Sequence, residues 1–260
     1  ITNTFDVSTA SYSQSFSVLT QESQPMGVAF NTAGTKMFVI GRSNDKVYEY
    51  TLSTGFDVST SIYVQDFSVS TQDVTPYALA FNTDGTKMFV VGTQYDKVYE
   101  YTLSTGFDIS TASYSHSFAV GGQDITPSGI AFNNDGTKMF VVGNSGNDVN
   151  EYTLSTGFDV STASFVDSFS VATEETLPYG VAFNPDGTKM FIVGDISNKV
   201  HEYNIGNTLA STGYQPCISS NIDSTYWTDI NSLTATNAVG DGNVFYAVSN
   251  DDKTAWSVLD

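Results

Sequence analysis

Four residues at a fixed spacing carry side chains that could contact a ligand. Each follows a proline that opens a short apolar segment, and successive copies are 51 residues apart: Met26, Tyr77, Ser128 and Tyr179. If the repeats surround a central channel, these residues would lie near its mouth. The two tyrosines among them could then stack on a sugar ring while their hydroxyl groups form hydrogen bonds. Aromatic packing between neighbouring units is the alternative, and the sequence leaves both open.

Polar residues in the loops could add ligand contacts. Arg42, the only arginine, and Tyr95 are candidate contacts. A hard cation such as Ca²⁺ takes six or more oxygen ligands, which acidic loops could supply. The candidate metal ligands are Asp45, Asp96, Asp148 and Asp195. No segment contains a dedicated calcium motif, so dispersed, solvated carboxylates are the simpler interpretation. That interpretation extends to Glu22, Asp73, Asp124, Glu174 and Glu175.

Signals of catalysis are few. The two histidines, His116 and His201, fall in predicted strands, far from any serine elbow or ligand cluster, and no Gly-x-Ser-x-Gly, His-Glu-x-x-His or phosphate loop is present. The single cysteine, Cys217, excludes an intrachain disulfide and a cysteine-built zinc site. Paired carboxylates for glycoside hydrolysis remain open. The near-identity of the repeats argues against one specialised pocket, which favours a protein that is not an enzyme.

Composition excludes some partners. The chain has 28 acidic and nine basic residues, a formal net charge of −19, which disfavours nucleic acid and anionic lipid. No apolar run is long enough to insert into a bilayer. The abundance of Ser, Thr, Asn and Gly is typical of extracellular, cell-surface and virion proteins. The chain begins at Ile1 without a signal-like segment, and we interpret it as a processed product or a fragment.

The elements that position these residues are repeated strands. The sequence Phe-Asn-x-x-Gly-Thr-Lys-Met-Phe occurs four times, 51 residues apart, beginning at Phe30, Phe81, Phe132 and Phe183. In the second copy, the segments 62–69, 76–81, 87–91 and 97–103 are rich in β-formers and predict strands. The segment Asn82–Gly85 predicts a turn, because glycine can adopt the positive φ that such a reversal needs.

Four short antiparallel strands in about 50 residues are typical of a β-propeller blade, and a parallel β-helix is the rival. We predict one all-β domain over residues 1–260, a five-bladed propeller. The expected blades are 24–70, 75–121, 126–172, 177–223 and 230–260. An N-terminal strand at about 8–19 would pair with the last blade and close the ring.

Propeller geometry places two sets of loops on one face. The first set is Thr20–Met26, Ser70–Tyr77, Val120–Ser128 and Ala172–Tyr179, and the second is Gly41–Lys46, Gly92–Lys97, Gly143–Val149 and Gly194–Lys199. The copies differ most in these loops, whereas the turns on the opposite face hardly change. A rigid scaffold with varied loops is a common way to build a binding face, although surface loops also drift after duplication.

One charged pair recurs in every repeat. Glu49, Glu100, Glu151 and Glu202 fall in the third strand, and hairpin register places a lysine diagonal to each: Lys36, Lys87, Lys138 and Lys189. A catalytic residue would not be expected four times. We therefore predict cross-strand Lys–Glu contacts, each worth a few tenths to about 1 kcal/mol.

The segment Ala-Phe-Asn-x-Asp-Gly-Thr-Lys-Met-Phe-Val-Val-Gly resembles the strand–turn–strand core of YVTN, NHL and gluconolactonase-like propeller repeats. The resemblance covers most of residues 25–205. It implies a blade but no particular activity, because these repeats occur in binders, scaffolds and hydrolases alike. The tail, including Asp229–Thr236, resembles segments of repetitive surface or structural proteins of marine bacteria and their phages, which implies a cell-surface or virion setting.

Two functions follow as hypotheses. The first is a non-catalytic extracellular or virion-associated propeller that binds glycan or a protein partner through its varied loops, in adhesion, host recognition or a structural role. It needs no cofactor, although Ca²⁺ is possible. The second is a metal-assisted hydrolase or lactonase with an acidic site at the channel mouth.

Overall fold

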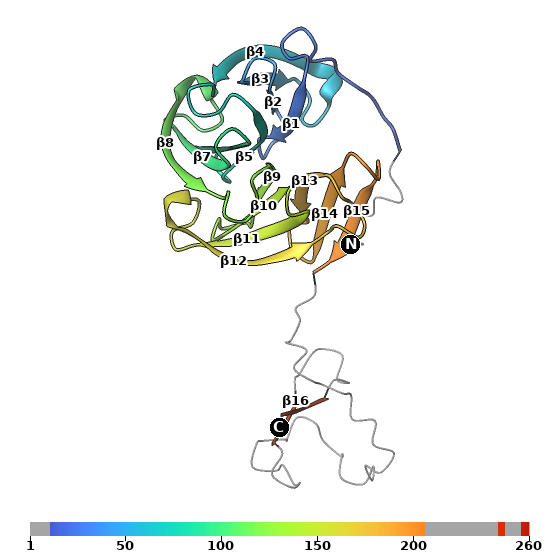
Figure 1. Cartoon of the computed structure of the whole chain (residues 1–260). Coiled ribbons are helices and arrows are strands. Elements are labelled where there is room, and N and C mark those ends of the chain that lie inside the picture. The colour runs from blue at the N-terminus through green and yellow to red at the C-terminus, as the bar shows by residue number, and fades with distance from the viewer. Residues whose placement is uncertain (1–10, 206–243, 248–255, 260) are drawn as a thin grey trace. The chain divides into compact units, whose positions relative to one another are not determined.

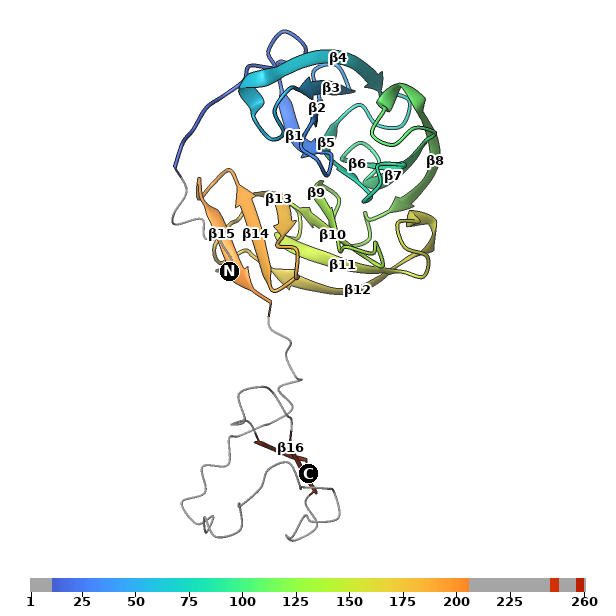
Figure 2. The same ribbon diagram turned by 180° about the vertical axis from the view of Figure 1, so that it is seen from behind.

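Residues 25–204 build antiparallel sheets arranged around a central axis (Figures 1 and 2). The computed structural model describes residues 11–205, 244–247 and 256–259. The chain divides into two compact units, Ile1–Ile205 and Gly206–Asp260. In the first unit the innermost strands are β1, β5, β9 and β13, and each contacts the next around the axis. This arrangement confirms the all-β class and the β-propeller.

Three blades have four strands each, in the order of the sequence. The first contains β1 Pro25–Phe30, β2 Lys36–Gly41, β3 Lys46–Leu52 and β4 Ser61–Ser68. The second contains β5 Pro76–Phe81, β6 Lys87–Gly92, β7 Lys97–Leu103 and β8 Ala112–Ala119. The third contains β9 Pro127–Phe132, β10 Lys138–Gly143, β11 Asp148–Leu154 and β12 Ala163–Ser170. A short 3-10 helix precedes each outer strand: η2 Val58–Thr60, η3 Ile109–Thr111 and η4 Val160–Thr162.

The prediction of five blades is wrong for the part of the chain that the structure describes, which forms four. The fourth blade consists of β13 Pro178–Phe183, β14 Lys189–Gly194 and β15 Val200–Asn204, and its predicted outer strand lies outside the described residues. In the predicted fifth blade, 230–260, the structure describes only β16 Val244–Ala247 paired with β17 Trp256–Leu259. Residues 11–18 have no regular strand structure. Residues 8–10 and most of the last blade, with which this segment was expected to pair, lie outside the described residues, so the closure of the ring stays a prediction. The sequence of the predicted fifth blade retains little of the repeat motif, so that prediction rested mainly on the spacing of its turn from the turn of the preceding repeat.

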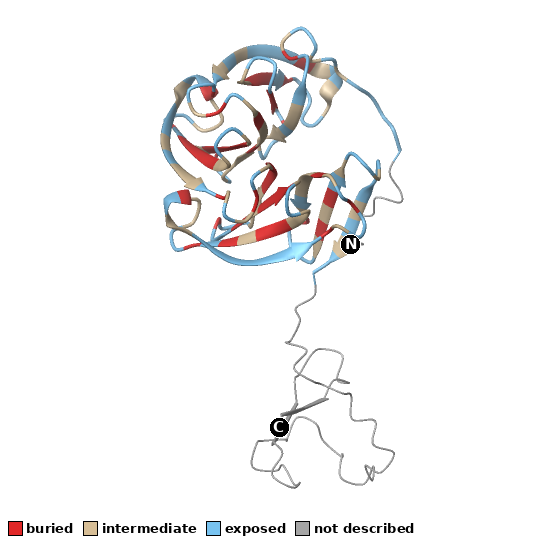
Figure 3. Ribbon diagram, viewed as in Figure 1, coloured by how far each residue is buried: buried red, intermediate tan, exposed pale blue. Residues whose placement is uncertain are grey.

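Apolar packing between consecutive blades forms the core. Phe38, Ile40 and Val47 of the first blade are fully buried against the second. The equivalent face of the fourth blade is not covered by described residues, and Val193 and Val200 are 45% and 52% exposed. Within a blade, buried residues are concentrated in the middle strands, whereas the outer strand β12 is mostly exposed (Figure 3).

The predicted Lys–Glu pairs are confirmed in all four blades. The Nζ–Oε1 distances are 2.7 Å for Lys36–Glu49, 2.8 Å for Lys87–Glu100, 2.6 Å for Lys138–Glu151 and 2.5 Å for Lys189–Glu202. The register is diagonal, as expected, because Glu49 lies directly opposite Phe38 and Thr51 lies opposite Lys36.

None of the helical segments in the described part of the chain has the length and hydrophobicity needed to span a bilayer.

Candidate functional site

Hydrogen bonds join the two predicted sets of loops on one face of the propeller. Ser23 Oγ lies 2.7 Å from Ser43 Oγ in the first blade. In the third blade, Ile125 N donates to Ser145 Oγ at 3.0 Å. Each bond connects the loop that enters an inner strand with the loop between the second and third strands. The predicted pairing of these loops on a shared face is therefore confirmed.

Four buried carboxylates hold these loops in place: Glu22, Asp73, Asp124 and Glu175, each at most 1% exposed. Asp124 accepts hydrogen bonds from Thr126 N at 2.6 Å and Gly146 N at 2.9 Å, so one side chain ties both loops together. Glu175 does the same with Leu177 N at 2.9 Å and Ser197 N at 3.1 Å. The expectation of solvated carboxylates is wrong at these four positions, because all four are buried and each accepts hydrogen bonds from its loop. Glu22 Oε2 and Asp73 Oδ2 are buried without a hydrogen-bond partner among the described residues.

The sequence contained a sign that these four carboxylates have a structural role. The four carboxylates are spaced 51 residues apart, at 22, 73, 124 and 175. A charge preserved at one position in otherwise varied loops indicates a structural role in every repeat. Glu174, which is outside this register, is exposed.

Three side chains from separate blades meet on this face. The rings of Tyr77 and Tyr179 are nearly parallel, with centroids 6.1 Å apart and an interplanar angle of 7°. Arg42 donates from Nη1 to Tyr77 Oη at 2.8 Å, and its Cζ lies 5.5 Å from the centre of the Tyr77 ring. The first, second and fourth blades thus contribute to a cluster of two rings and one guanidinium, which we call the Arg42–Tyr77–Tyr179 cluster.

Local structure explains why these side chains converge. Tyr77 and Tyr179 are the second residues of β5 and β13, immediately after the proline that begins each inner strand. Arg42 follows β2, and its Nε donates to Gln24 Oε1 at 3.0 Å, which fixes the direction of the guanidinium. Because two of its five N–H groups are used, Arg42 retains donors for a ligand.

The other two residues of the proline series have different surroundings. Ser128 is 2% exposed, and its Oγ lies 2.9 Å from Pro178 O and 3.2 Å from Val142 O. Its hydroxyl group is therefore part of the packing between the third and fourth blades. Met26 is partly buried and lines, with Ser128 and Tyr179, a cavity of about 450 Å³ along the inner strands. Most of the other residues that line this cavity are apolar.

Tyr95 is 56% exposed and makes no hydrogen bond or ring contact with the cluster among the described residues. The candidate metal ligands also differ in position. Asp45 and Asp96 are equivalent, with φ of 54° and 53° in the loop before the third strand. Asp148 begins β11, and Asp195 is the fourth-blade equivalent of Arg42.

Electrostatics on this face penalise ionisation of the partly buried loop carboxyls Asp45 and Asp96. Burial raises the pKa of Asp45, and the nearby Asp73 and Glu22 add to the effect. Burial likewise raises the pKa of Asp96, together with Asp124 and Asp73. The pKa of Tyr179 is raised by burial first and then by the neighbouring Tyr77. Tyr179 therefore keeps its hydroxyl proton at neutral pH.

A cavity of about 1080 Å³ lies at the other end of the inner strands and is lined by Phe30, Phe81, Phe132 and Phe183 with repeat turns. Hydrogen bonds link those turns around the ring: Thr32 Oγ1 donates to Thr83 O at 3.1 Å, and Asn134 Nδ2 donates to Pro185 O at 2.8 Å. The side chains there are nearly constant between repeats, which indicates a structural role.

No protein-family model matches the chain, and no curated protein matches its sequence. Solved structures do match in fold. A candidate 6-phosphogluconolactonase from Bacteroides uniformis is 13% identical with a TM-score of 0.52, and the match covers 70% of this chain and 51% of that one. A protein from Lactobacillus plantarum is 17% identical with a TM-score of 0.50, covering 71% and 52%.

A periplasmic gluconolactonase from Pseudomonas aeruginosa is also similar, at 17% identity and a TM-score of 0.47, with coverage of 71% and 50%. The chain spans about half the length of these structures. At such low identity, the likeness to the Bacteroides uniformis and Lactobacillus plantarum structures supports the fold and gives no activity.

Proposed function

We propose that this propeller is a carbohydrate-binding module whose ligand contacts the Arg42–Tyr77–Tyr179 cluster. The observation that carries the proposal is the parallel arrangement of Tyr77 and Tyr179, 6.1 Å apart, with Arg42 bonded to the first ring. Stacked tyrosines present an apolar surface for the C–H groups of a sugar ring and hydroxyl groups for its oxygens. Arg42 adds N–H donors for sugar hydroxyl or carboxylate groups.

The surroundings of the cluster suit this role. Arg42 is exposed, and Tyr77 and Tyr179 are partly buried, so the cluster is held by packing while part of it remains accessible to a ligand. The loops that carry them are fastened by buried carboxylates, which reduces the conformational entropy lost when a ligand binds. We place the protein outside the cell, on a cell or virion surface, where its composition of Ser, Thr, Asn and Gly is common.

A glycan array with the full chain, with and without Ca²⁺, tests the proposal. We expect binding to a defined set of sugars, reduced at least tenfold by Tyr179→Ala or Arg42→Ala. Tyr95→Ala is the matched control, because Tyr95 is an exposed tyrosine on the same face outside the cluster. An array without binding, or equal losses in Tyr95→Ala and Tyr179→Ala, would overturn the proposal. Capture of a protein partner through the same side chains would favour a protein ligand instead.

A metal-assisted hydrolase or lactonase is the second candidate. It is supported by the fold shared with a candidate 6-phosphogluconolactonase and by the clustering of Asp45 with Asp73 and Glu22. It predicts one tightly bound cation on the loop face and lactone hydrolysis that Asp45→Asn abolishes. Metal analysis after dialysis, together with a lactone hydrolysis assay, distinguishes it from the binding module.

A further inference from the structure

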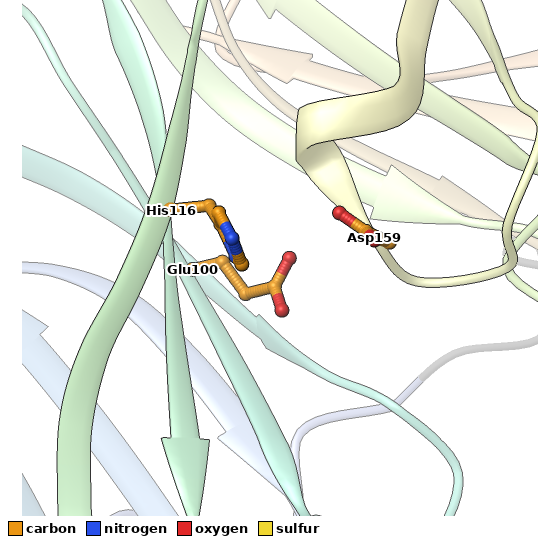
Figure 4. A group of neighbouring side chains, drawn as sticks. All are labelled: Glu100, His116 and Asp159. Atoms are coloured by element: carbon orange, nitrogen blue, oxygen red, sulfur yellow. The ribbon is translucent and has the colours of Figure 1, made fainter.

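The boundary between the second and third blades holds three metal-ligating side chains that the proposed carbohydrate site does not use. Glu100 lies on β7, His116 on β8, and Asp159 in the loop before η4 (Figure 4). One oxygen of each carboxylate and one ring nitrogen of His116 all lie within 4.8 Å of one another. His116 was expected to be far from any ligand cluster, and that expectation is wrong.

The boundary between the first and second blades shows which contacts the residue equivalent to His116 makes in another repeat. There Gln65 lies opposite Glu49, as His116 lies opposite Glu100. Gln65 Nε2 donates one hydrogen bond to Glu49 Oε2 and one to Asp108 Oδ1, both at 2.8 Å. The two N–H groups of one amide therefore join an outer strand to the next blade and neutralise neither carboxylate.

Histidine cannot repeat this arrangement. The Nδ1 atom of His116 lies 2.7 Å from Ser115 Oγ, which leaves Nε2 for the two carboxylates. In the described part of the chain, no hydrogen bond links His116 to Glu100 or Asp159. Even when protonated, Nε2 has one N–H for two acceptors. A divalent cation, in contrast, accepts a lone pair from all three side chains at once.

The local charge favours such a cation. Glu100 is 1% exposed, and Lys87 Nζ lies 2.8 Å from its Oε1. Its Oε2 accepts a hydrogen bond from Val160 N at 3.0 Å. In the first blade the corresponding Oε2 of Glu49 accepts from both Ile109 N and Gln65, so this oxygen can accommodate a second partner. Two carboxylates and one lysine leave one net negative charge for the cation.

We propose that Glu100, His116 and Asp159 form a site for a divalent transition metal such as Zn²⁺, which bridges the second and third blades. Imidazole and carboxylate ligands suit this class of ion, with bonds of about 2.0–2.2 Å and ligand atoms about 3–4 Å apart. The observed ligand atoms, which all lie within 4.8 Å of one another, are close to that spacing. Ser115 orients the ring through the nitrogen that does not bind the metal.

Calorimetric titration of the full chain with Zn²⁺, after treatment with a chelator, tests the site. We expect one ion per chain, and with Co²⁺ we expect visible absorption bands that report nitrogen and oxygen ligands. The variant His116→Gln installs the residue that the first blade carries and should bind at least about tenfold more weakly. Asp159→Asn should also weaken binding, while asparagine preserves the N-cap that Asp159 provides to Ser161 N.

A reciprocal variant makes the test stricter. Gln65→His gives the first blade the same three residue types, and we expect a second equivalent of Zn²⁺ to bind. Equal affinity in the wild type and His116→Gln would overturn the proposal, as would no binding of Zn²⁺ or Co²⁺ to a wild type whose circular dichroism shows it folded. If the wild type binds no metal and its stability rises on protonation of His116, an imidazolium is the bridge and the metal proposal is wrong.

Discussion

Phe16 packs edge-on against Tyr50 of the first blade, with ring centroids 5.6 Å apart and an interplanar angle of 79°. The same contact joins each outer strand to the next blade, as in Phe67–Tyr101 at 5.5 Å and Phe118–Tyr152 at 5.5 Å. Residues 11–18 therefore lie on the first blade where a preceding outer strand would lie. The hydrogen bond from Gln14 to Asp57 repeats the bond from Gln65 to Asp108 and supports the same equivalence.

Phe16→Ala should lower the free energy of unfolding because it removes this contact. Phe16 is partly buried, so we expect a loss of about 1–2 kcal/mol, less than the ~3–5 kcal/mol of a fully buried phenylalanine. Urea denaturation followed by fluorescence measures the loss. Tyr12→Ala is the control, since Tyr12 is 83% exposed and its removal should change little. Equal stability of Phe16→Ala and the wild type would show that residues 11–18 do not stabilise the first blade.

The repeat explains how much of the fold could be predicted. The inner three strands of each blade contain the conserved motif, so their positions, the turn at Asn82–Gly85 and the Lys–Glu register all followed from sequence. Phe16 lies in the segment at about 8–19 for which a strand was expected, and it makes the ring contact that Phe67 makes one repeat later. What failed was the count of blades, because residues 230–260 retain little of the motif.

Glu49→Ala should cost far more stability than Glu202→Ala, although both carboxylates pair with a lysine. The Glu49 side chain is 2% exposed and also binds Gln65 and Ile109 N of the next blade, whereas Glu202 is 28% exposed. Breaking a buried pair costs about 3–5 kcal/mol, and an exposed pair contributes about 0–1 kcal/mol. We therefore expect Glu49 to depart from the uniform small value that the sequence predicted for all four pairs. Chemical denaturation of both variants measures the difference, and equal losses would contradict it.

Gly85→Ala should destabilise the second blade at its inner turn. Gly85 has a φ of +72°, and a Cβ there would overlap the ring of Phe107. Left-handed strain and the clash together should cost at least about 2 kcal/mol. Gly122→Ala is the control, since no described atom lies within 4 Å of its Cβ position. Thermal unfolding of both variants distinguishes them, and a fully stable Gly85→Ala would show that Phe107 moves without cost.

The candidate site was less predictable than the fold. The sequence placed Tyr77 and Tyr179 after equivalent prolines but gave no sign that their rings would stack across the ring of blades. The sequence also listed Ser128 with the two tyrosines as a candidate ligand contact. Its hydroxyl group is instead buried and donates a hydrogen bond to Pro178 O. Residue type at one repeat position therefore decides whether the side chain packs between blades, as in Ser128, or joins the cluster, as in Tyr77 and Tyr179.

Asp45→Asn should stabilise the protein at neutral pH. The pKa of Asp45 is raised by burial and by Asp73 and Glu22, so the ionised carboxylate is less favourable in the folded state than in the unfolded chain. The penalty is present above the folded-state pKa and disappears as the pH falls below the unfolded value. Asparagine suits the left-handed φ, since Asn147 has a φ of 51° at the same repeat position. The gain should be on the order of a few tenths of a kcal/mol at pH 7 and absent near pH 3.

Asp84→Asn should show the opposite pH dependence. Hydrogen bonds from the side chain and backbone of Thr86 lower the pKa of Asp84, so its ionised form stabilises the folded state above the unfolded pKa. That contribution is lost as the pH falls through the folded-state pKa, and Asp84→Asn should therefore be destabilising at pH 7 and nearly neutral in acid. Thermal melts of both variants from pH 3 to pH 8, with a chelator to remove Ca²⁺, measure the two trends. Parallel curves would show that charge at Asp45 and Asp84 does not control stability.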